Sequence, residues 1–120
     1  MRVKTILVSL ITLCFLSCKD LIEVEDISAE SVTVLAPMDN VTLNENIVTF
    51  SWEPLEYAET YQLQIVAPSF ESPAQIVQDT IVLNNSFSGS FSANNYQWRI
   101  KALNFAYETQ YTTQNLTIEE

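Results

Sequence analysis

The chain has 120 residues, among them 15 Asp and Glu, five Lys and Arg and no His, so its formal net charge is −10. This length allows one domain. Apolar residues make up 48% of the chain, which is too large a fraction for a disordered protein. The negative charge argues against nucleic acid as a partner, because few side chains are available to neutralise phosphates. Having no His removes the commonest general base and metal ligand. The single Gly excludes a Walker loop, a dinucleotide-binding fingerprint and a G-x-S-x-G nucleophile elbow.

Residues 1–17 have the pattern of a secretory signal. Arg2 and Lys4 precede an almost wholly apolar run at positions 6–16, and the small residue Ser17 follows it. The run is about eleven residues long, whereas a membrane-spanning helix needs roughly twenty. We therefore expect no retained transmembrane helix.

The end of this signal, Phe15-Leu16-Ser17-Cys18, resembles the lipobox of bacterial lipoproteins. The resemblance implies cleavage before Cys18, a lipid on its thiol and an anchor in the bacterial outer membrane. Phe15 stands where the family usually has Leu, and Cys14 fits less well because the bulky Leu13 precedes it. The alternative is that Cys18 is a free buried thiol. After cleavage before Cys18, no second thiol would remain for a disulfide.

Residues 18–30 are interpreted as the lipidated Cys and an acidic tether, since five of the 15 acids lie between positions 19 and 31. Such a stretch is typical of a solvated linker. Lys19-Asp20 resembles the Lys-plus-acid tether of some Gram-negative lipoproteins exported to the cell surface, although Leu21 stands where a second acid is usual. Surface exposure and a periplasm-facing position both remain open. A calcium site is a third alternative, but the EF-hand spacing is absent.

Residues 31–120 predict one all-β domain. Short runs rich in β-branched and aromatic residues alternate with Asn, Pro, Ser and Asp, and no window shows convincing helical periodicity. Seven such runs at roughly ten-residue spacing predict a seven-stranded β-sandwich made of two sheets. The pairs Asn84-Asn85 and Asn94-Asn95 are expected turns, because Asn tolerates the left-handed conformation. The predicted strands are 31–36, 47–52, 61–66, 74–83, 87–91, 96–102 and 111–118.

Four segments carry a resemblance to a fibronectin type III-like domain: Leu35-Ala36-Pro37 before a turn, the second strand with its Trp-Glu-Pro ending (48–54), the approach to the third strand and the strand itself (58–65), and the Tyr-x-Trp-x-Ile-x-Ala pattern with its continuation (96–104). The resemblance implies a seven-stranded antiparallel β-sandwich of the immunoglobulin or fibronectin type III kind. The resemblance implies that Trp52 lies in the core and that the hydroxyl of Tyr96 makes a corner hydrogen bond. Alternation also places Tyr61 and Trp98 on inward faces. The family's motifs are specific for the fold and almost silent on function.

The acids offer no clear catalytic pair. Glu53, Glu56 and Glu59 fall in a polar connection between strands, where acids are usually solvated, and a Ser or Thr nucleophile would have no His partner. We therefore expect no enzymatic activity, no metal and no cofactor. Arg99 and Lys101 are the only cations of the folded domain, and we expect them to balance internal charge.

The candidate contact residues are aromatic and lie in or near predicted loops: Tyr57, Phe70, Phe105, Tyr107 and Tyr111. The loops that hold Tyr57 and Phe105 should cluster at one end of the sandwich. The alternative is that these rings cover a sheet edge or cap the core.

These features predict a membrane-anchored, non-catalytic protein-binding or scaffolding module, lipid-anchored at the bacterial outer membrane, with another envelope protein as its partner. A glycan-binding accessory lipoprotein is the alternative, and a purely structural spacer is a third possibility. A coplanar pair of exposed aromatic rings would favour a sugar ligand. A broad apolar patch or a bare edge strand would favour a protein.

Overall fold

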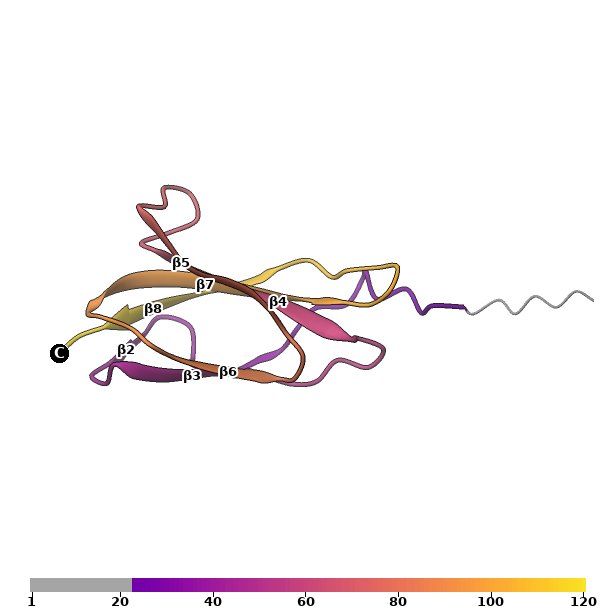
Figure 1. Ribbon diagram of the computed structural model, residues 1–120, viewed down its shortest axis with the longest axis horizontal. Helices are drawn as coiled ribbons and strands as arrows, with labels where there is room; N and C mark the ends of the chain where they lie inside the picture. Colours follow the sequence, from indigo (N-terminus) through magenta and orange to yellow (C-terminus); the bar gives the residue numbers. More distant parts are fainter. Residues whose placement is uncertain (1–22) are drawn as a thin grey trace, which may run out of the picture.

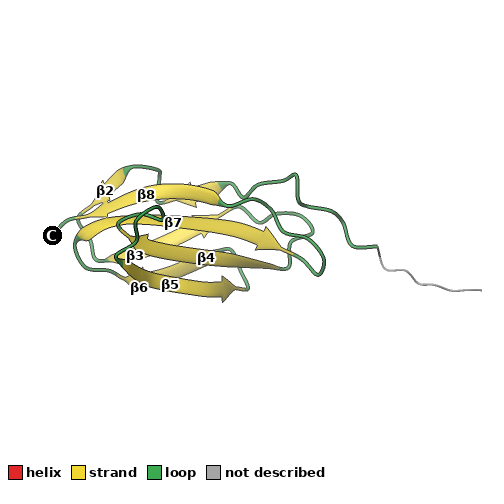
Figure 2. Ribbon diagram, turned by 90° about the horizontal axis from the view of Figure 1, so that it is seen from above, coloured by secondary structure: helices red, strands yellow, loops and turns green. Residues whose placement is uncertain are grey.

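The computed structural model describes residues 23–120, which form two β-sheets packed face to face (Figures 1 and 2). The three-stranded sheet has the order β1-β3-β6 and the five-stranded sheet the order β2-β8-β7-β4-β5. The predicted signal at 1–17 and the predicted lipid site at Cys18 lie outside the described residues. The strands are β1 (Val34–Ala36), β2 (Val41–Leu43), β3 (Ile47–Trp52), β4 (Thr60–Ala67), β5 (Gln75–Val82), β6 (Ser86–Ser90), β7 (Asn94–Leu103) and β8 (Thr112–Ile118).

The core forms where the alternating faces of the two sheets meet. On β3, Val48, Phe50 and Trp52 are buried, and on β7 the inward set begins with Tyr96 and Trp98. The Phe50 ring meets Trp98 edge-on at 4.9 Å between centroids, so it joins the two sheets. Neither buried indole N–H of Trp52 or Trp98 has a hydrogen-bond partner among residues 23–120.

Two buried tyrosines connect strands to neighbouring loops through hydrogen bonds of their hydroxyl groups. The hydroxyl of Tyr96 donates a 2.7 Å hydrogen bond to the carbonyl of Ser92, which is the corner bond that the resemblance implied. Tyr61 packs edge-on against Trp52 and accepts a 3.0 Å hydrogen bond from the backbone N–H of Leu55. Both rings are buried, and each hydroxyl is satisfied by a backbone group of an adjacent loop.

The sheets differ from the prediction in strand number and in one turn. There are eight strands, because Val41–Leu43 forms a short β2 that runs parallel to β8. The chain enters β2 through Asn40, whose φ of 65° is left-handed. The pair Asn94-Asn95 is not a turn, since both residues begin β7 and pair with Ile118 and Thr117 of β8.

The packed domain begins earlier than position 31, where the acidic composition placed the end of the tether. Ile27 and Val32 are 2% and 3% exposed and belong to the core. A turn closed by the hydrogen bond from Glu30 N to Ile27 O returns the chain toward β1. Ser28 donates to Asp26 from its hydroxyl and its backbone N–H, and these bonds hold the pKa of Asp26 below its usual value. One apolar residue therefore ties an acidic segment to the domain.

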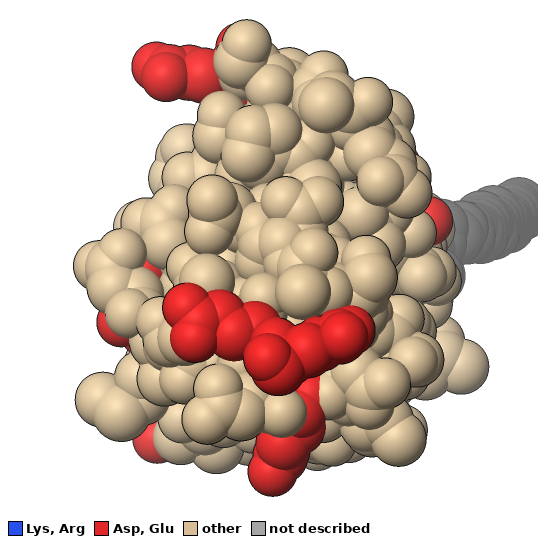
Figure 3. Space-filling model, turned by 90° about the vertical axis from the view of Figure 1, so that its left-hand side faces the viewer, with Lys and Arg blue, Asp and Glu red and all other residues tan. Residues whose placement is uncertain are grey.

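The two ends of the described chain lie at opposite ends of the sandwich (Figure 1). Figure 3 views the end where the C-terminus lies, and acidic side chains gather there with no Lys or Arg in sight. Residues 23–120 contain all of the acids except Asp20, and their two cations, Arg99 and Lys101, both lie on β7. The surface charge is therefore strongly negative, with its positive groups confined to one face.

Candidate binding surfaces

Three of the five candidate aromatics are exposed at the end where the described chain begins. Phe105 is 84% exposed, Tyr57 56% and Tyr107 38%. The side-chain amide of Asn104 donates to the backbone carbonyls of Tyr57 and Glu25, so it connects the β3–β4 and β7–β8 loops to the segment that precedes β1. The expected clustering of the two loops at one end is therefore present.

Tyr57 has an unusual backbone. Its φ is 71°, in the left-handed region that bulky residues rarely adopt. The turn is closed by the hydrogen bond from Ala58 N to Leu55 O, and Asn104 holds the Tyr57 carbonyl. The rings in contact with one another in the described residues are all pairs of the core aromatics, so the exposed rings present no stacked platform.

The other two candidate aromatics lie on the outer face of the five-stranded sheet, against a cation. The guanidinium carbon of Arg99 lies 4.0 Å from the centroid of Phe70 and 4.1 Å from that of Tyr111. The Nε of Arg99 donates a 2.8 Å hydrogen bond to Gln64 Oε1 on the neighbouring strand. Phe70 is itself placed by a 2.8 Å hydrogen bond from its backbone N–H to Gln97 Oε1.

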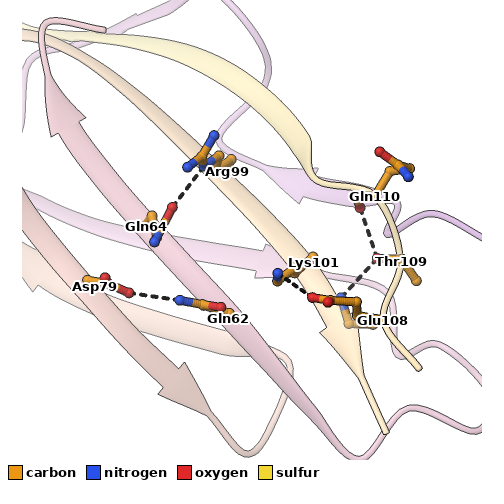
Figure 4. Close-up of polar contacts among 9 residues, drawn as sticks. Gln62, Gln64, Asp79, Arg99, Lys101, Glu108, Thr109 and Gln110 are labelled. Carbon is orange, nitrogen blue, oxygen red and sulfur yellow. Dashed lines mark hydrogen bonds and ion pairs between the residues drawn. The ribbon is translucent and has the colours of Figure 1, made fainter. Parts of the chain in front are cut away.

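The two cations of β7 have different surroundings (Figure 4). Lys101 forms an ion pair with Glu108 and also lies over the Tyr111 ring. The hydrogen bond with Glu108 is the main reason that the pKa of Lys101 is raised above its usual value. Arg99 has no carboxylate within ion-pair distance among the described residues. The expectation that both cations balance internal charge therefore fits Lys101 but not Arg99.

A hollow of about 230 Å³ lies beside Arg99, between the β4–β5 loop and the sheet. Its apolar lining is formed by Val66, Phe70, Pro73 and Ile76, and Arg99 is one of its polar lining residues. The remaining polar members are Gln64 and Asp79. Alternation along β4 and β7 places Gln62, Gln64, Arg99 and Lys101 on one face, but the pattern alone does not show the rings beside Arg99.

The edge strand β5 exposes an apolar surface that the sequence interpretation missed. Ile76, Ile81 and Leu83 are 71%, 52% and 79% exposed at and just beyond this eight-residue strand. No described strand pairs with its outer side, because β5 ends the sheet order. A signal was present: the run 74–83 has apolar residues at both odd and even positions, so one set has to face outward.

Glu53, Glu56 and Glu59 are exposed, as expected for solvated acids. Residues 23–120 contain no group of three or more His, Cys, Asp or Glu placed to hold a metal ion. No helix in the described region is long and apolar enough to cross a bilayer.

Fibronectin type III domains are among the solved structures that resemble this fold. Neither protein-family models nor curated proteins give a match to this chain. A fibronectin(III)-like module of Clostridium thermocellum CbhA matches with a TM-score of 0.54 and 9% identity, over 73% of this chain and 95% of that one. The fn3 domain of human collagen alpha-1(XX) chain gives 0.57 and 13%, over 78% and 89%. A structure described as FN3tt gives 0.51 and 13%, over 74% and 96%.

The class of protein is thus defined by its fold: residues 23–120 form a fibronectin type III-like β-sandwich. At these identities the likeness shows the fold alone. The fold by itself does not define a function, because one β-sandwich fold hosts many unrelated roles.

Proposed function

We propose that this chain is a bacterial outer-membrane lipoprotein, anchored through Cys18, whose sandwich binds another envelope protein along β5. The observation that carries the proposal is the bare edge of β5. An exposed edge strand offers unpaired N–H and C=O groups, and an extended segment of a partner can add to it as a further strand.

β5 differs from the other edges of the two sheets. β1 and β2 have three residues each, and β6 is a five-residue strand of sequence SFSGS, whereas β5 has eight residues and exposes two Ile. Short or polar edges are the usual protection against unwanted strand pairing. β5 contains no Lys and no Pro, and its one acid, Asp79, accepts a hydrogen bond from Gln62 of β4. A long, apolar and unprotected edge fits a partner strand.

The same features favour a protein over a glycan. A sugar site would use flat aromatic platforms, but Trp52 and Trp98 are fully buried, and the exposed Tyr57 and Phe105 form no ring pair within the described residues. The apolar surface lies instead on β5. The lipid anchor is supported by the lipobox resemblance at positions 15–18.

Site-directed photo-cross-linking of the full-length protein in its native membrane tests the partner surface. A photoreactive amino acid replaces Ile81 on β5 or, as a matched control, Ile47, which is 64% exposed on β3 of the other sheet. We expect one reproducible partner from position 81 and not from 47, and Ile76→Lys should abolish that cross-link. Equal products from both positions, or none from position 81, would refute the edge as the contact surface.

The anchor is tested separately with Cys18→Ser, which should abolish metabolic labelling with a fatty acid. Labelling that persists in this variant would exclude Cys18 as the lipid site. Because the two experiments have independent readouts, either half of the proposal can fail alone.

A further inference from the structure

The starting point is an uncompensated charge on the outer face of the five-stranded sheet. Lys101 is neutralised by Glu108, but Arg99 meets no carboxylate among residues 23–120. Its Nε is bonded to Gln64, and no hydrogen bond joins either terminal nitrogen to a described residue. A guanidinium carries five N–H donors, so four of them remain for a ligand or for water.

The guanidinium is held in place before any ligand arrives. The ring centroids of Phe70 and Tyr111 lie 4.0 and 4.1 Å from the central carbon of the guanidinium. Phe70 comes from the β4–β5 loop, and the hydrogen bond from its backbone N–H to Gln97 fixes that loop to β7. Restricting a long Arg side chain in advance reduces the conformational entropy that binding would otherwise cost. The approach left open is the hollow beside Arg99.

The size and walls of this hollow limit what fits. Its volume of about 230 Å³ is below the roughly 300–1,000 Å³ of pockets that hold drug-sized molecules, so it suits one amino-acid residue or a group of similar size. An apolar surface next to the Arg99 guanidinium is formed by Val66, Pro73 and Ile76. The ligand should therefore carry an apolar body within a few bonds of its anionic group.

The charge around the hollow selects the anion. A guanidinium fork matches both carboxylate and phosphate. Asp79 lines the same hollow, and the domain around it is strongly acidic, so a doubly charged phosphate would be repelled more than a single carboxylate. One Asp79 oxygen accepts from Gln62, and the other has no hydrogen-bond partner among the described residues. That oxygen is available to a backbone N–H.

We propose that this hollow binds the C-terminal carboxylate of a peptide whose last residue is apolar. In such a residue the carboxylate, the apolar side chain and the backbone N–H all leave one Cα. They can then meet Arg99, the wall at Ile76 and Asp79 within a single-residue volume. The hollow borders β5 but needs no strand on its edge, so this inference is independent of the proposed function.

The test uses the ¹⁵N-labelled full-length chain in nonionic detergent micelles and the peptide acetyl-Gly-Gly-Leu with a free carboxylate. The chain has two arginines, Arg2 and Arg99, so the Arg99 Nε–H signal can be assigned by comparison with Arg99→Lys. We expect saturable shifts of that signal and of the Phe70 amide. The peptide with an amidated C-terminus should bind at least about tenfold more weakly, because charged hydrogen bonds are lost.

Three variants make the result specific. Arg99→Lys keeps the charge but loses the fork, and it should weaken binding by at least about tenfold. Gln64→Glu places a carboxylate at the Arg99 Nε, so it should block the peptide in a protein that stays folded. Lys101→Gln removes the neighbouring charge outside the hollow and should leave the affinity unchanged. Equal binding of the amidated peptide, or equal loss in Lys101→Gln, would overturn the proposal. Binding of isovalerate as tight as the peptide's would overturn its assignment to a peptide.

Discussion

Replacing Ile27 by Ala tests whether the acid-rich segment before β1 is part of the fold. The side chain is 2% exposed and belongs to the core. Truncating such an Ile costs about 2–5 kcal/mol, from lost burial and the cavity that remains. A domain of this size has a free energy of unfolding of about 5–15 kcal/mol. A loss of about 3 kcal/mol would therefore be a large part of the total and should lower Tm by about 12–24 °C.

Urea unfolding followed by tryptophan fluorescence measures this change, because Trp52 and Trp98 are both fully buried and report on the whole core. The matched control is Ile47→Ala, at a strand position that is 64% exposed, where we expect a loss below about 1 kcal/mol. If Ile27→Ala costs less than about 0.5 kcal/mol with an unchanged m-value, residue 27 is not part of the core. The folded domain would then begin near position 31, as the composition suggests.

Two further predictions concern polar contacts. Tyr96→Phe leaves the Ser92 carbonyl without its 2.7 Å hydrogen bond and should cost about 0.5–1.5 kcal/mol in urea unfolding; an unchanged midpoint would show that the corner bond adds no stability. The ion pair with Glu108 raises the pKa of Lys101. The contribution of this ion pair to the free energy of unfolding is therefore complete at a pH below the ordinary lysine pKa, and it is lost as the pH rises through the pKa of Lys101 in the folded protein. The stability difference between the wild type and Glu108→Gln should therefore be present at about pH 9 and should vanish at high pH. A difference that stays constant across that range would contradict the assignment.

Much of the architecture follows from period-two alternation. The strand predicted at 47–52 has the bounds of β3, and the inward set of β7 is the one that alternation assigns. Three features of the fold were not predicted from the sequence, each for a physical reason. β2 has only three residues, too few for a pattern, and its pairing with β8 is a contact between distant segments. Asn94 and Asn95 have turn propensity, but strand pairing with β8 overrides it. Ile27 is one apolar residue among acids, so composition hides its burial.

The candidate site was harder to predict than the fold. The sequence identifies Phe70 and Tyr111 as loop aromatics, but their contact with Arg99 depends on the register of three strands. On β5 the outward face does not follow simple alternation, because the pairing with β4 shifts between Ile65 and Val66. A bulge of this kind changes which residues face solvent, and nothing in the local sequence marks it.

The placement of the chain ends has a mechanical consequence. The described chain begins at one end of the sandwich and finishes at the other (Figure 1), so a pull between residue 23 and Glu120 runs along the strands. The last strand, β8, lies between β2 and β7 and is bonded on both sides. Inter-strand hydrogen bonds of the antiparallel β7–β8 pair lie across the strand direction, so tension shears two rows of them together instead of opening one row bond by bond. Under load the domain should extend little before it yields, in a single step.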